Sequence, residues 1–370
     1  MKKTNFFLFI MILFGTLSFV GCKKPVEDDD ETKWVKIIES YTDNTVIVTY
    51  KNMATNAVEL MHLCEQMRLN PTDLLITEAC KSWKQTRQYW EQSEAFLYGP
   101  AEYNSLDPHI DSWPLDLNRL LQVLAQPDIL DIDAAYVRTN FGASLVGFHA
   151  VEYVLFNNGA PRQSTQLSAA ELSYLTALSR VLAEDCILLE GSWSGVEALS
   201  ADKRTILTQA DLTISSNFGK EFKNAGKVGS RYTSAIQAVQ EIIEGCKDIA
   251  DEVGNSKIAD PVSSGNVLEV ESWYSWNSLQ DFINNINSIQ NSYYGSTTGI
   301  AEHSLSTFVA EKNKDLDIEI KNNIQNAKDK IRDIGEPFRN HLDNHVGADA
   351  AIKACDNLFN SLQKIYSVLD

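Results

Sequence analysis

The sequence has 370 residues, of which 44% are hydrophobic and 22% are charged, and this composition excludes disorder over most of its length. Its 50 acidic against 32 basic side chains give a formal net charge of −18, which would repel a phosphate backbone and excludes nucleic acid as a partner. The chain contains only 18 glycines and 9 prolines, and this low content of turn-forming residues favours a helical protein over a turn-rich β protein.

The chain begins with the features of a secretion signal. Lys2 and Lys3 precede an apolar run, residues 6–20, that is too short to span a bilayer comfortably. The run ends in Gly21-Cys22, and a small residue before a cysteine resembles the lipobox of bacterial lipoproteins. This resemblance implies that residues 1–21 are a lipoprotein signal peptide and that Cys22 is lipidated and anchors the protein to a membrane. An ordinary signal peptide with a chance cysteine is the alternative.

An acidic stretch follows the predicted anchor. Residues 27–31 are all Asp or Glu and cannot pack, so we expect a solvated tether over residues 22–33. Acidic residues this close to a lipidated cysteine also resemble export signals that place some lipoproteins on the cell surface. We therefore expect an outer-membrane lipoprotein that is either periplasm-facing or exposed at the surface.

The rest of the chain has the periodicity of amphipathic helices, with apolar residues three and four positions apart. The clearest cases run over 46–67, 320–334 and 352–369, and further helical windows cover 71–98, 130–157, 168–190, 202–222, 231–252 and 274–293. Segments 99–116 and 254–269 contain Pro, Gly or Ser and are predicted to be long loops. The predicted fold class is all-α, with bundle-like packing of the helices.

Glycines at 219, 226 and 229 interrupt the helical pattern near residue 225. We therefore predict an N-terminal helical domain over 34–225 and a C-terminal helical domain over 226–370. The five cysteines after Cys22 have no zinc-type spacing and mostly occupy apolar helical positions, which predicts buried thiols.

One segment of the first domain carries candidates for chemistry. His149 and Glu152 are three residues apart in a helical window, so both project from the same face. Together they can ligate a metal or act as an acid/base pair, and a buried structural pair is the alternative. Gly147 is unfavourable inside a helix, which indicates that another backbone or a ligand approaches closely there.

The pattern GxHxxE over residues 147–152 resembles the signature of the imelysin family. Three further blocks are similar to that family and occur in the same order: 87–100 with Glu94, 110–116 with Asp111 and Trp113, and 271–295 with Glu271, Ser275 and Asp281. The resemblance covers most of residues 40–370.

The resemblance implies two bundle-like helical domains packed side by side, with a site at their interface. His149 and Glu152 would be metal ligands, and the remaining ligand-binding residues would be Glu94, Asp111, Trp113, Glu271 and Ser275. Carboxylates with one imidazole suit a cation such as iron or zinc. Alternatively, Trp113 is a packing anchor and Ser275 is the N-cap of its helix.

Three functions remain open at this point. The first is an envelope lipoprotein that binds iron, another metal or a haem-type ligand for uptake, with an outer-membrane receptor as its protein partner. The second is a metallopeptidase, the activity for which the family was named, with Glu152 or Glu94 as general base. The 147–152 segment supplies only two metal ligands, and this incomplete ligand set counts against a metallopeptidase. The third is a surface adhesion or glycan-binding module. No catalytic residue is assigned.

Overall fold

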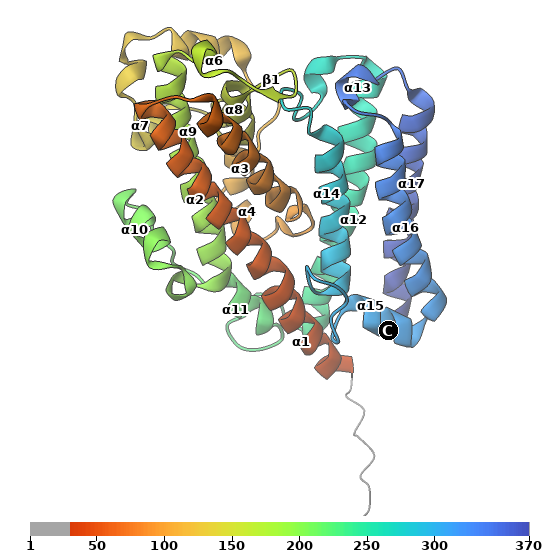
Figure 1. Ribbon diagram of the computed structural model, residues 1–370. Helices are drawn as coiled ribbons and strands as arrows, with labels where there is room; N and C mark the ends of the chain where they lie inside the picture. Colours follow the sequence, from red (N-terminus) through yellow and green to blue (C-terminus); the bar gives the residue numbers. More distant parts are fainter. Residues whose placement is uncertain (1–29, 370) are drawn as a thin grey trace, which may run out of the picture.

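The computed structural model describes residues 30–369, most of which are helical (Figure 1). This confirms the predicted all-α fold. The strands in the described part of the chain are two short ones, β1 (Phe156–Asn157) and β2 (Ala160–Pro161), which pair antiparallel. The predicted signal peptide, Cys22 and most of the acidic tether lie outside the described residues.

Residues 30–33 were predicted to belong to the tether. This part of the prediction is wrong, because the first helix, α1 (Asp30–Tyr41), already begins at Asp30. Two acidic residues, Asp30 and Glu31, occupy its first turn, where negative charge is favourable beside the N-terminal end of the helix dipole. The helix then buries an apolar face that includes Trp34 and Ile38, and this burial holds it on the protein.

The first bundle is built around three long helices. From α1 the chain passes through a π-helical turn, η1 (Thr42–Val46), into α2 (Ile47–Leu69), which packs against α3 (Asp73–Glu91) and α9 (Ala169–Ser194). Thr72 and Ser168 cap the N-termini of α3 and α9 by accepting backbone N–H groups. Shorter helices complete this half: α4 (Pro100–Tyr103), α5 (Leu106–Ile110), α6 (Leu117–Leu124), α7 (Ala134–Asn140), α8 (Gly147–Leu155), α10 (Ala201–Gln209) and α11 (Phe218–Lys223).

The second bundle lies beside the first (Figure 1). Its members pack on one another and are α12 (Ala235–Glu252), α14 (Ser278–Tyr294), α15 (Leu305–Lys312), α16 (Lys314–Asp333) and α17 (His345–Gln363). The bundles meet where α3 contacts α14 and where α1 contacts α12, and Trp34 of α1 packs against Phe308 of α15 with the two rings tilted by 50°. The predicted domain boundary near residue 225 falls between α11 and α12.

The prediction of a long loop over 254–269 was wrong. The chain continues from α12 through a second π-helix, η7 (Val253–Ile258), into α13 (Ala259–Ser264). Buried Val253, Ile258 and Val262 give this segment an apolar face. Gly254 lets its backbone lie against α17, since a Cβ there would be 3.0 Å from the Cβ of Cys355.

Two predicted helical windows are broken in the structure. The window 130–157 contains α7 and α8, separated by a short 3-10 turn, η4 (Ala143–Leu145), and the window 202–222 contains α10 and α11. The predicted loop 99–116 carries the short helices α4 and α5. The five cysteines of residues 30–369 are buried, as predicted, and the structure shows all five as free thiols. Within those residues, no helix is long and apolar enough to cross a membrane.

Candidate metal centre

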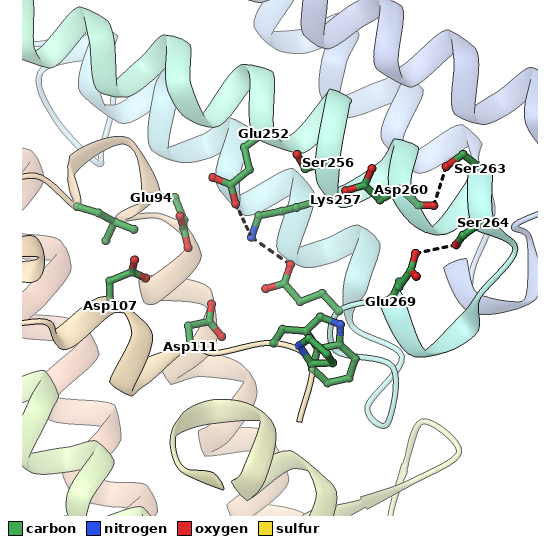
Figure 2. Close-up of a pocket in the computed structure, with 14 residues that line it drawn as sticks. Glu94, Asp107, Asp111, Glu252, Ser256, Lys257, Asp260, Ser263, Ser264 and Glu269 are labelled. Carbon is green, nitrogen blue, oxygen red and sulfur yellow. Dashed lines mark hydrogen bonds and ion pairs between the residues drawn. The ribbon is translucent and has the colours of Figure 1, made fainter. Parts of the chain in front are cut away.

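A cavity of about 620 Å³ opens where the two bundles meet. Figure 2 shows Glu94, Asp107 and Asp111 of the first half facing Glu252, Lys257 and Asp260 of the second. Seven of the lining side chains are carboxylates and a single one is basic, Lys257; the acids are Glu94, Asp107, Asp111, Glu252, Asp260, Glu269 and Glu271. The cavity therefore favours a positively charged ligand.

Gly147 brings the two parts of the first-half wall together. It starts α8 with a φ of +76°, and a Cβ at this position would lie 2.2 Å from the carbonyl oxygen of Ile110. Only glycine tolerates both the positive φ and this contact. The close approach predicted at Gly147 is thus made by the end of α5, and it sets Asp111 beside His149.

His149 is fully buried, and carboxylates surround its imidazole. Its Nδ1 lies 3.1 Å from Glu152 Oε2, and its Nε2 lies 3.1 Å from Asp111 Oδ1 and 3.8 Å from Glu271 Oε1. Despite these distances, Nε2 has no hydrogen-bond partner with acceptable geometry. Burial and the charge of Arg87 lower the pKa of His149, but the three carboxylates outweigh them and raise it well above its ordinary value.

Glu152 contacts the Nδ1 side of the imidazole, and Ser275 in turn holds Glu152 in place. Glu152 Oε1 accepts a hydrogen bond of 2.8 Å from the backbone N–H of Ser275, and its Oε2 faces His149. Such a carboxylate fixes the orientation and the tautomer of a ligating imidazole. The alternative reading of Ser275 as an N-cap is wrong, because α14 begins at Ser278 and Asn277 occupies the cap position.

Arg87 is the central residue that the sequence reasoning missed. This guanidinium is fully buried and pairs with four carboxylates: with Asp111, with Glu91 at 2.6 Å, with Glu271 at 2.7 Å and with Asp281 at 3.3 Å. A planar guanidinium with several fixed donors can hold carboxylates at set positions. Arg87 thereby joins α3, the segment after α5, and the second bundle at one point.

The surrounding charges set the pKa values of the carboxylates. Burial raises the pKa of Asp111, but the opposing effect of Arg87 and His149 is larger, so the pKa falls below its ordinary value, to about 2. Glu271 is shifted well below its ordinary pKa, since Lys257, His149 and Arg87 outweigh its burial. Glu94 has a raised pKa because it is buried, with Lys257 opposing and nearby carboxylates adding to the rise. Asp111 and Glu271 are therefore the carboxylates that these charges hold ionised.

The structure brings most of the predicted site residues together. Donor atoms of Asp111, His149 and Glu271 lie within 4.8 Å of one another, as do those of a second group formed by Glu91, Glu94 and Asp111. Trp113 packs edge-on against His149, with ring centroids 4.6 Å apart. Glu152 was predicted to be a metal ligand, but it belongs to neither of these two groups. Two carboxylates and one imidazole form a donor set for iron, zinc or manganese.

These features define a class: a helical protein of two bundles with a buried histidine–carboxylate centre between them. The family model described as Imelysin matches residues 46–365, so the chain belongs to the imelysin family. Iron-regulated protein A of Synechococcus elongatus is 26% identical over 318 residues, which are 86% of this chain and 80% of that protein.

Solved structures agree with this assignment. The structure described as a putative iron-regulated protein A precursor from Parabacteroides distasonis is 30% identical, with a TM-score of 0.80, and the match covers 95% of this chain and 97% of that one. An imelysin-like protein from Psychrobacter arcticum has the same fold at 14% identity, with a TM-score of 0.59 and coverage of 93% and 94%.

Proposed function

We propose that this imelysin-family protein binds a metal cation, with iron as the favoured ion, through Asp111, His149 and Glu271. One observation carries the proposal: His149 Nε2 is fully buried without a hydrogen-bond partner, and carboxylate oxygens lie at 3.1 and 3.8 Å. The ion pairs of Nε2 with these carboxylates are poorly aligned as hydrogen bonds, and a metal ion that replaces the Nε2 proton would be bound by all three groups. A bound cation would also relieve the repulsion between the carboxylates.

The cavity supports a free or hydrated cation rather than an anionic chelate. Seven carboxylates line it, and its apolar lining consists of Leu97, Trp113 and Pro114. Haem carries an apolar ring and two carboxylates, so it needs apolar walls and suffers repulsion here. Ferric citrate, also an anion, is disfavoured for the same electrostatic reason. The volume of about 620 Å³ leaves room for the water ligands of a cation.

The proposed role is cation capture for uptake at the cell envelope. Lipidation at Cys22 would anchor the protein to the outer membrane, and an outer-membrane receptor would supply the ion. Two relatives carry the name iron-regulated protein A, which is consistent with this role.

A second candidate is a metal-dependent peptidase, and Glu94 is the observation that favours it. This carboxylate lines the cavity, and its raised pKa is typical of acid/base groups. Both oxygens of Glu152 are engaged, by Ser275 and His149, so Glu152 is poorly placed as general base. A peptidase would show chelator-sensitive cleavage of an unfolded protein substrate that is lost in Glu94→Gln.

Calorimetric titration of the metal-stripped protein with ferrous iron under anaerobic conditions, zinc, ferric citrate and haem tests the proposal. The chain offers a matched control for His149→Ala, because His62 and Glu65 form the same i, i+3 pair at 3.1 Å on an exposed face. We expect His62→Ala to bind each of the two metals, ferrous iron and zinc, with the same affinity as wild type. His149→Ala should lose the binding of both metals. Unchanged affinity in a folded His149→Ala would refute the assignment.

A further inference from the structure

Lys257 is the one basic side chain among the residues that line the cavity. Its ammonium group lies 3.0 Å from Glu271 Oε2 and 3.6 Å from Glu252 Oε1. It extends from the π-helix η7. Helices of this type are rare in proteins, and those that occur are often found at functional sites. A lysine whose side chain is only 11% exposed, at the wall of an acidic cavity, therefore requires an explanation beyond packing.

Two of the side chains that pair with Glu271, Arg87 and Lys257, differ in their freedom to move. Its Oε1 faces Arg87 at 2.7 Å and His149 at 3.8 Å, while its Oε2 accepts from Lys257. Arg87 has four carboxylate partners and is fully buried, so it cannot leave. Lys257 lies at the cavity wall and has a flexible four-carbon chain. It also has a second partner, Glu252, whose side chain is 51% exposed.

We propose that Lys257 is an internal competitor of the metal: its ammonium group neutralises Glu271 in the metal-free protein and moves to Glu252 when a cation binds. This inference rests on the proposed metal-binding function. A metal that uses Glu271 comes close to the ammonium group, and the like charges repel strongly in this partly buried setting. The ammonium group has an acceptor to move to, because Glu252 is already within 3.6 Å.

This exchange has a consequence for selectivity. An incoming ion must compensate for the lost contact between Lys257 and Glu271, and a metal with affinity for the imidazole of His149 gains an additional ligand in return. Magnesium and calcium prefer oxygen ligands and gain little from an imidazole. The cost of displacing Lys257 is the same for every divalent ion, so Lys257 lowers the affinity for all of them, and only ions that also gain the imidazole, such as ferrous iron and zinc, still bind tightly.

The test compares zinc affinity by calorimetry in wild type, Lys257→Met, Lys257→Arg and a control, Lys321→Met. Lys321 forms a similar pair with Asp317, at 2.7 Å, in α16 and is not a cavity residue. We expect Lys257→Met to bind zinc about tenfold more tightly, because one repelling charge is gone. Lys257→Arg keeps the charge and should not gain affinity, and Lys321→Met should match wild type. The affinity for magnesium should rise by a similar factor in Lys257→Met, because the same charge repels both divalent ions.

The outcomes separate the two proposals. Zinc binding by wild type with equal or weaker binding by folded Lys257→Met overturns the role of Lys257 and leaves the metal site standing. Absence of zinc binding in both proteins overturns the metal site together with this inference. A purely structural ion pair would lower the melting temperature of Lys257→Met without a gain in affinity.

A second measurement uses the wild-type protein and does not depend on how a variant folds. Lysine acylation by a water-soluble reagent, mapped by mass spectrometry, reports the accessibility of each amine with and without zinc. We expect the labelling of Lys257 to rise several-fold on zinc loading, because its amine moves toward the exposed Glu252, while that of Lys321 stays constant. Labelling of Lys257 that falls or does not change on loading contradicts the displacement.

Discussion

Replacing Arg87 with methionine removes the positive charge at the centre of the site. The guanidinium is fully buried and pairs with Glu91, Asp111, Glu271 and Asp281. Removing one partner of a buried ion pair typically lowers the free energy of unfolding by about 3–5 kcal/mol, since charges are left uncompensated. We expect Arg87→Met to fall in this range, in part because Asp111 and Glu271 would lose the cation that holds them ionised.

Urea unfolding followed by circular dichroism measures this loss, with Arg138→Met as the control. Arg138 also pairs with two carboxylates, Glu184 and Asp185, but its side chain is 26% exposed, so we expect a smaller loss.

The same loss should depend on pH through Asp111. Its folded pKa of about 2 lies below the unfolded value of about 3.9, so its ionised form stabilises the fold above the unfolded pKa. That contribution disappears as the pH falls through the folded pKa. The difference between wild type and Arg87→Met should therefore narrow from pH 4 toward about pH 2. A loss below 1 kcal/mol at pH 7, or a gap that widens in acid, would refute the reasoning.

Two further predictions rest on the same geometry, and a third rests on the sequence. Because the pKa of His149 is raised, a proton competes with the metal for Nε2, and zinc affinity measured by calorimetry should rise by up to about tenfold per pH unit between pH 6 and 8; a flat profile would contradict this. Gly147→Ala forces a strained φ and a clash with Ile110, so its melting temperature should drop, with about 2 kcal/mol lost and weaker metal binding; unchanged stability would contradict the close approach. Cys22→Ser should release the protein from the membrane fraction into the soluble one, as judged by immunoblotting, and retention in the membrane fraction would argue against the lipid anchor.

Regular amphipathic helices could be predicted from the sequence, and interrupted ones could not. The C-terminal helix α17 buries Ala351, Cys355, Leu358 and Leu362, whose spacing is that of a single helical face. The segment 253–264 has Gly, Ser and Pro among its apolar residues, which suggested a loop. It is helical because tertiary contacts with α17 stabilise it, and those contacts are invisible to a local pattern.

The site divides in the same way. His149 was selected because it shares a helical face with Glu152, and Asp111 and Glu271 because their surroundings resembled a family pattern. The structure places the three together. Arg87 and Lys257 lie in segments where a charged residue is normally exposed, and their burial depends on carboxylates from distant parts of the chain. One signal for Arg87 was present: on α3 it lies close to Trp83 and Trp90 around the buried face, an unusual place for an unpaired charge.

The most direct test of the metal site is a crystal structure of the zinc-loaded protein with anomalous data collected at the zinc edge. We expect one strong peak at about 2.0–2.2 Å from His149 Nε2, Asp111 and Glu271. The same peak should be absent from crystals of His149→Ala grown with zinc. A peak elsewhere in the cavity, or no peak at full zinc loading, would contradict the assignment of these three residues as the metal ligands.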